Sequence, residues 1–122
     1  MTAALAHGGP VTLDSTASIA DGLLPVRAGS LTYEHIAALT EGVALVTDDA
    51  IQCASAFLLH QHHLVVEFSG AATTAALIMG ALDLEDRRVA VVLSGGNMEP
   101  SLLVDLMQPA ASGLSAAPPG AD

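Results

Sequence analysis

The sequence of 122 residues contains no lysine and no tryptophan, and its basic residues besides histidine are Arg27, Arg87 and Arg88. It has 13 acidic side chains, so the formal net charge is -10 at pH 7. A nucleic-acid surface needs clustered basic side chains that displace the counterions of phosphate, and an anionic membrane surface attracts similar clusters. The composition therefore argues against both kinds of partner.

Cysteine and long apolar runs are also scarce. The single cysteine, Cys53, excludes an intrachain disulfide and a zinc site built from several cysteines, so we expect a reducing, cytoplasmic location. The longest apolar stretch, residues 71–82, is interrupted by threonines and a glycine and is shorter than the roughly 20 residues that span a bilayer. The first residues carry no basic segment ahead of an apolar run, so we expect neither a transmembrane helix nor a secretory signal peptide.

Aromatic side chains make up only 2% of the chain, whereas 52% of its residues are hydrophobic. Any core must therefore rest on alanine, valine, leucine and isoleucine. At this length the chain forms at most one domain, and a typical fold would bury roughly two thirds of its unfolded surface. We place this domain at residues 1–107 and predict that residues 108–122, rich in proline, alanine, serine and glycine, are a disordered tail.

Apolar patterning predicts helices that alternate with short buried strands. The runs at residues 43–46 and 89–93 are apolar without alternation, as in strands that are covered on both faces. Thr47 is a candidate N-cap, followed by two aspartates in the first helical turn. Helices are expected over residues 1–7, 32–39, 48–62, 71–82 and 100–107. Together these elements predict an α/β layer with a mostly parallel sheet.

The strand over residues 89–93 ends in Ser94-Gly95-Gly96-Asn97. The carboxyl ends of strands are where open α/β sheets bind ligands, and two glycines let the backbone approach a flat molecule without interference from a Cβ. Ser94 would place a hydroxyl at that edge. A glycine pair after a strand is also commonly a simple turn, so the motif alone leaves both interpretations open.

Five sequence blocks occur in a characteristic order, at residues 18–23, 31–33, 46–51, 64–72 and 89–97. This succession closely resembles the C-terminal part of the threonine/serine dehydratase and serine racemase family, over about residues 11–97. The members are pyridoxal-phosphate enzymes with the tryptophan-synthase β-like architecture, fold type II. The resemblance implies that residues 1–107 form the C-terminal part of a large cofactor-binding domain, with short parallel strands and flanking helices.

The resemblance also implies cofactor-binding roles for Ser94, Gly22 and Glu67. In the family, the serine at the position of Ser94 donates to the pyridine nitrogen of the cofactor, while Gly22, Glu67 and Asp21 would lie around the site. A neutral hydroxyl does not hold the ring nitrogen protonated as a carboxylate would, which suits elimination better than transamination. Other interpretations stay open, because Asp-Gly is a common turn and Glu67 could cap the helix that follows. Phe68 stands where the family usually has proline.

The implied reaction is elimination of water from L-threonine or L-serine, giving 2-oxobutanoate or pyruvate plus ammonia. It needs a lysine that forms a Schiff base with the cofactor and a glycine-rich loop for the phosphate. Both lie upstream in the family, and this chain has no lysine. We therefore expect a C-terminal portion, beginning at an internal methionine, that contains no catalytic residue and is inactive alone.

Several alternatives remain at this point. Serine racemase and hydroxyaspartate dehydratase belong to the same family, and a non-catalytic remnant acting as an interaction module is a different class of function. A homo-oligomer is also possible. His60, His62 and His63 suggest a metal, but no carboxylate follows at ligand spacing, so no metal site is predicted. Cys53 is interpreted as a buried, inert thiol rather than a nucleophile.

Overall fold

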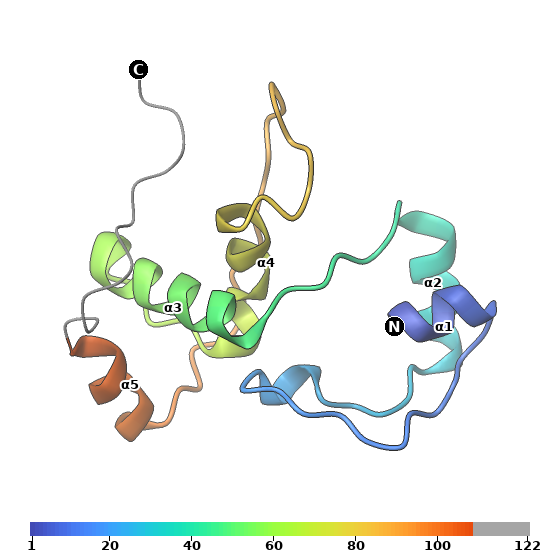
Figure 1. Cartoon of the computed structure of the whole chain (residues 1–122), viewed down its shortest axis with the longest axis horizontal. Coiled ribbons are helices and arrows are strands. Elements are labelled where there is room, and N and C mark those ends of the chain that lie inside the picture. The colour runs from blue at the N-terminus through green and yellow to red at the C-terminus, as the bar shows by residue number, and fades with distance from the viewer. Residues whose placement is uncertain (109–122) are drawn as a thin grey trace.

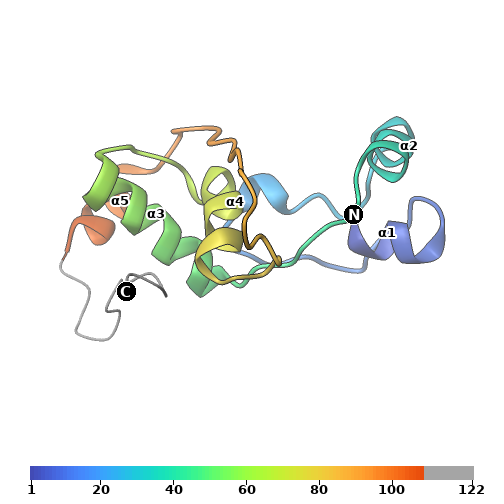
Figure 2. The same cartoon turned by 90° about the horizontal axis from the view of Figure 1, so that it is seen from above.

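The computed structural model describes residues 1–108, which form five α-helices and one 3-10 helix. Figure 1 shows α3, α4 and α5 packed together at one end, with α1 and α2 at the other, and Figure 2 shows the same separation from above. The 3-10 helix η1 lies against α4. The helices are α1 (Thr2–His7), η1 (Asp21–Leu23), α2 (Ser30–Leu39), α3 (Asp48–His62), α4 (Phe68–Ile78) and α5 (Pro100–Met107).

The longest helix, α3, has the bounds that its end signals predict. The Thr47 hydroxyl accepts a hydrogen bond from the amide of Ala50 at 3.2 Å, and two aspartates follow in the first turn. His63 ends the helix with a left-handed φ of 57°. The bounds of α5 also match the prediction, with Pro100 in its first turn.

The helix α4 lies earlier in the sequence than the apolar run at residues 71–82 predicts. Glu67 is the residue before its first turn and has an extended backbone, with φ -61° and ψ 159°. The other end is set by Gly80, whose φ is 62°, and by the Ala81 amide, which donates to the Ala76 carbonyl at 3.0 Å. Hydropathy alone did not identify this stop, because the residues on both sides of Gly80 are apolar.

The core is built from small and aliphatic side chains, in agreement with the composition. It lies where α3, α4 and α5 meet, and Ala20 from the segment before η1 joins it. Its alanines, Ala20, Ala54, Ala71 and Ala75, are each 0% exposed. The larger members of the cluster are Ile51, Leu58, Val66, Phe68 and Leu106.

The predicted parallel sheet is not formed within residues 1–108. Residues 43–46 and 89–93 are not helical, but neither segment pairs with a strand. In the described part of the chain, β-pairing is limited to an isolated antiparallel bridge between Thr12 and Arg27. A strand needs a neighbouring strand to accept and donate its backbone hydrogen bonds. Leu45 and Val92 are each 73% exposed, so these apolar segments are also uncovered on at least one face.

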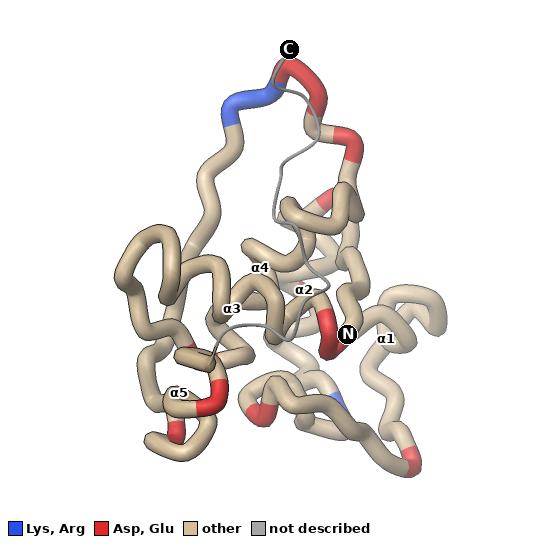
Figure 3. Tube along the Cα trace, turned by 60° about the vertical axis from the view of Figure 1, so that its left-hand side comes forward, with Lys and Arg blue, Asp and Glu red and all other residues tan. Residues whose placement is uncertain are grey.

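Acidic residues occur at several separate places along the described trace, whereas the basic residues occur at two places (Figure 3). Arg87 and Arg88 are adjacent in the loop between α4 and α5. Among residues 1–108, no helix combines the length and the apolar character needed to cross a membrane. The tail predicted at residues 108–122 lies, apart from Gln108, outside the described residues.

Candidate functional site

The start of α4 is the point where two remote segments of the chain meet. One is the η1 turn with Asp21 and Gly22, and the other is the loop of residues 94–97 that precedes α5. Both contact residues 67–70. The three residues expected to bind the cofactor, Gly22, Glu67 and Ser94, are therefore brought to one end of one helix.

Gly22 is joined to α4 through Ser69. The Gly22 amide donates to the Ser69 hydroxyl oxygen at 2.9 Å, and that hydroxyl donates to the Asp21 carboxylate at 3.3 Å. A Cβ added to Gly22 would lie 2.9 Å from the Ser69 oxygen, which is closer than two such atoms normally approach. A larger residue here would therefore have to displace the Ser69 hydroxyl that accepts from the Gly22 amide, so the Asp-Gly sequence also forms a contact with α4.

Glu67 fastens the loop of residues 94–97 to the start of α4. Its amide donates to the Gly95 carbonyl at 3.2 Å, and its carboxylate accepts from the Asn97 amide at 3.1 Å. Gly95 has a φ of 75°, and a Cβ at this position would lie 2.0 Å from the Glu67 carboxylate. Although Glu67 holds the N-cap position of α4, its side chain makes no capping hydrogen bond. Its side chain is thus committed to the loop and does not cap the helix.

The backbone around Ser94 is held by two further residues of α4. The Ser94 carbonyl oxygen faces Gly70, where an added Cβ would come within 1.6 Å of it. The Thr73 hydroxyl donates to the Val92 carbonyl at 3.0 Å. Ser94 itself is exposed, so its side-chain hydroxyl is accessible to a ligand. The loop backbone at Ser94 is therefore held against α4 by Gly70 and Thr73.

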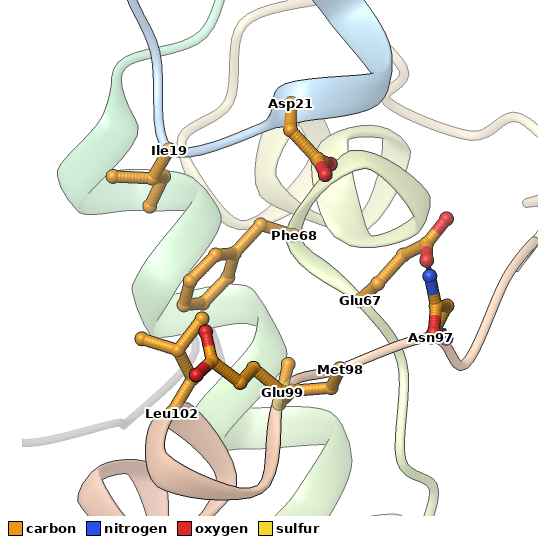
Figure 4. Close-up of a pocket in the computed structure, with 8 residues that line it drawn as sticks. All are labelled: Ile19, Asp21, Glu67, Phe68, Asn97, Met98, Glu99 and Leu102. Atoms are coloured by element: carbon orange, nitrogen blue, oxygen red, sulfur yellow. Dashed lines mark hydrogen bonds between the residues drawn. The ribbon is translucent and has the colours of Figure 1, made fainter.

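A hollow of about 220 Å³ lies beside this junction (Figure 4). Glu67 lines it with Asp21 and Glu99, so its rim is acidic. The apolar part of its wall comes from the segment before η1, from α4, and from α5 and the residues that precede it, through Ile19, Phe68, Met98 and Leu102. Of the three expected cofactor-binding residues, the lining includes Glu67.

Sequence reasoning missed the partners that hold the expected residues in place. Ser69 and Gly70 precede the helix expected over residues 71–82 and received no role, although each makes the contact that fixes Gly22 or Ser94. Asn97 is the last residue of the motif that follows the predicted strand, and the sequence does not predict its contact with Glu67. The available signal was the glycine at residue 70, since a glycine inside a helix often marks a close approach of another backbone.

The histidine cluster has structural contacts. A ring nitrogen of His60, Nε2, lies 2.8 Å from the Leu106 carbonyl and donates to it, linking α3 to α5. The His62 ring packs edge-on against Phe57 with centroids 5.2 Å apart. Within residues 1–108, no group of three histidine, cysteine or acidic side chains is arranged to hold a metal ion. Cys53 is half-buried on α3 rather than fully buried.

Comparison with known proteins agrees with the resemblance given by the five sequence blocks. Residues 1–95 match the family described as "Pyridoxal-phosphate dependent enzyme". The catabolic L-threonine dehydratase TdcB of Escherichia coli (strain K12) is 36% identical over 100 residues, which cover 80% of this chain and 30% of that relative. The chain thus spans about 30% of the length of this curated relative.

Two solved structures are similar to this one. The processed form of threonine deaminase isoform 2 from Solanum lycopersicum has a TM-score of 0.74 at 25% identity, covering 87% of this chain and 32% of that one. The serine racemase of Dictyostelium discoideum has a TM-score of 0.70 at 35% identity, covering 80% of this chain and 31% of that one. The helices and connecting segments of this chain therefore have the arrangement found in part of these larger proteins.

Proposed function

This chain belongs to the pyridoxal-phosphate dependent enzyme family, and from that premise we propose that it forms the pyridine-nitrogen edge of the cofactor site of a threonine/serine dehydratase. One observation carries the proposal: Gly22, Glu67 and Ser94, which are far apart in the sequence, meet at the first turn of α4. The family uses pyridoxal phosphate as its cofactor.

The residues present fit this cofactor in two respects. Ser94 offers an exposed, neutral hydroxyl on a fixed backbone, which suits donation to a ring nitrogen that is not held protonated. Gly95 follows it without a side chain, and the Glu67 carboxylate occupies the space that a Cβ would fill and so holds the loop beside Ser94. When bound, pyridoxal phosphate supplies an electron sink for the carbon that loses its substituents. Gly22 and Glu67 would line the same edge.

Each of these residues has a limited task in the proposal. Ser94 binds and orients the ring, while Glu67 and Gly70 hold the Ser94 loop in place. Gly22, held by Ser69, lines the same edge as Glu67. The sequence contains no lysine, so this chain does not supply the lysine side chain that bonds covalently to the cofactor. That lysine must be supplied by a polypeptide outside these 122 residues.

The parallel strands of the fold-type-II architecture belong to the same proposal. Residues 43–46 and 89–93 would pair with strands outside this sequence, which accounts for their exposed apolar side chains and their lack of a partner within residues 1–108. The single cysteine supports a cytoplasmic location for the assembled protein. A homo-oligomer is compatible with this arrangement.

The proposed substrates are L-threonine and L-serine, which would give 2-oxobutanoate or pyruvate plus ammonia. Serine racemisation is the second candidate, favoured by the 35% identity to the Dictyostelium racemase. The product distinguishes the two candidates, since a racemase yields D-serine and a dehydratase yields a keto acid.

The proposal is tested by mixing this chain with the part of the E. coli dehydratase that lies outside the matched region. With pyridoxal phosphate and L-threonine we expect 2-oxobutanoate from the mixture, and with L-serine we expect pyruvate. This chain alone should give neither product. A fused chimera, in which this chain replaces the matched region, removes the need for the two pieces to associate. A folded chimera that releases neither keto acid nor D-serine would contradict the proposal and favour a non-catalytic interaction module.

A further inference from the structure

Asp48, in the first turn of α3, is bound to the segment that leads into η1. Its Oδ1 accepts from the Ser18 hydroxyl at 2.6 Å, and its Oδ2 accepts from the Ile19 amide at 3.2 Å. The Ser18 oxygen in turn accepts from the Ala20 amide at 3.0 Å. One carboxylate therefore orders three consecutive residues, directly and through a hydroxyl.

These three residues lie immediately before the Asp21–Gly22 turn. Ala20 is 0% exposed and belongs to the core, so the segment is fixed by packing as well as by hydrogen bonds. In the turn that follows, the Gly22 amide donates to the Asp21 carboxylate at 2.7 Å and to the Ser69 hydroxyl of α4 at 2.9 Å. Gly22 is thus positioned between two anchors, one at the start of α3 and one at the start of α4.

The neighbouring aspartate provides an internal comparison. Asp49 lies in the same first turn of α3 and carries the same charge near the positive end of the helix dipole. Asp49 is exposed, whereas Asp48 is half-buried and engages the segment at residues 18–20. The hydrogen bonds distinguish Asp48 from Asp49, since their charge at the helix start is the same.

We propose that Asp48 is a positioning residue, which acts through Ser18 and the 18–20 backbone to place the Gly22 amide against Ser69. It makes no contact with a ligand in this role. A role for Gly22 at the cofactor depends on the proposed function. The positioning of Gly22 by Asp48 does not depend on it. The two can therefore be tested separately.

The test compares Asp48→Ala with Asp49→Ala in the full chain, by backbone amide hydrogen exchange in NMR. Removing a charged acceptor should raise the exchange rates of the Ile19 and Ala20 amides about tenfold, and that of Gly22 in the same direction. Asp49→Ala loses the same charge and should leave these three rates within about twofold of the unaltered chain.

The exchange rates of core amides and variants of Ser18 distinguish local positioning by Asp48 from a general loss of stability. Amides of α3 and α4, such as those of Leu58 and Ala75, should keep their rates in Asp48→Ala. Ser18→Thr retains the hydroxyl and should preserve slow exchange, whereas Ser18→Ala should reproduce the loss at Ala20. Combining Ser18→Ala with Asp48→Ala should add little at Ala20, because the two groups act in one chain of hydrogen bonds.

Three results would overturn the inference. They are unprotected Ile19 and Ala20 amides in the unaltered chain, equal effects of Asp48→Ala and Asp49→Ala, and an increase in exchange that is uniform across α3 and α4. The same variants in the chimeric dehydratase provide a second readout, the affinity for pyridoxal phosphate, which Asp48→Ala should lower and Asp49→Ala should not. If the amides of residues 19, 20 and 22 exchange as expected but the folded chimera has no activity, the placement of Gly22 by Asp48 is supported and the proposed function is refuted.

Discussion

The carbonyl oxygen of Ser94 lies against the α-carbon of Gly70, so closely that a Cβ on Gly70 would come within 1.6 Å of that oxygen. Ser94 comes directly before a glycine turn, and Gly70 lies inside α4. Their contact sets the distance between the loop and the helix, and with it the position of the exposed Ser94 hydroxyl. A glycine in a helix, which ordinarily costs about 0.5–1 kcal/mol relative to alanine, is here required by the packing.

Gly70→Ala should therefore destabilise the chain, although alanine is the better helix former. We expect a loss of about 1–3 kcal/mol in the free energy of unfolding, because the added methyl group meets backbone that must move. Urea denaturation followed by circular dichroism measures this loss. Gly42→Ala is the matched control, since a Cβ there meets nothing within 4 Å, and equal effects of the two variants would contradict the packing described.

Gly95→Ala should cost more than Gly8→Ala. Both glycines have a left-handed φ, 75° and 81°, so both substitutions incur a similar backbone strain of about 1 kcal/mol. At Gly8 nothing lies within 4 Å of the added Cβ, whereas at Gly95 the Cβ would meet the Glu67 carboxylate. That carboxylate must then move away from the Asn97 amide.

The Asn97 amide reports this movement directly. In Gly95→Ala its NMR signal should shift and its hydrogen exchange should accelerate. Combining Gly95→Ala with Glu67→Ala should cost less than the sum of the single changes, because removal of the carboxylate relieves the clash. Additive costs, or an Asn97 signal unaffected by Gly95→Ala, would be inconsistent with the observed contact.

Ser55→Ala tests the support beneath Glu67. Ser55 is 1% exposed, and its hydroxyl donates to the Val66 carbonyl at 2.8 Å, one residue before Glu67. Its removal leaves a buried carbonyl without this donor, so we expect a loss of about 1–3 kcal/mol in the free energy of unfolding. Ser101, exposed on α5, is the control, and Ser101→Ala should stay within about 0.5 kcal/mol of the unaltered chain in the same denaturation assay. Indistinguishable unfolding curves for the two variants would argue against this support.

Local signals in the sequence predicted some elements well. Thr47 and the two aspartates after it define the start of α3, and the glycine at residue 8 ends α1 with a φ of 81°. The order of the five blocks identified the family, because it depends on many residues rather than on one motif. These features are encoded over short stretches of sequence, where capping and turn preferences act.

Features that depend on distant partners were not predictable in the same way. The runs at residues 43–46 and 89–93 have strand-like composition, but a β-ladder also needs a second strand, which residues 1–108 do not provide. Glu67 was expected near the cofactor or as a helix cap, and its link to Asn97 spans 30 residues of sequence. Such contacts become visible only when the chain is folded.

The central claim is that Ser94, held by the start of α4, binds the ring of pyridoxal phosphate. Its most direct test is the affinity of the chimeric dehydratase for pyridoxal phosphate, measured for Ser94→Ala and for Ser30→Ala, which alters another exposed serine. Loss of one hydrogen bond of about 1 kcal/mol should weaken binding about fivefold in Ser94→Ala. Ser30→Ala should bind as the unaltered chimera does. Equal affinities for the unaltered chimera and Ser94→Ala would contradict the account.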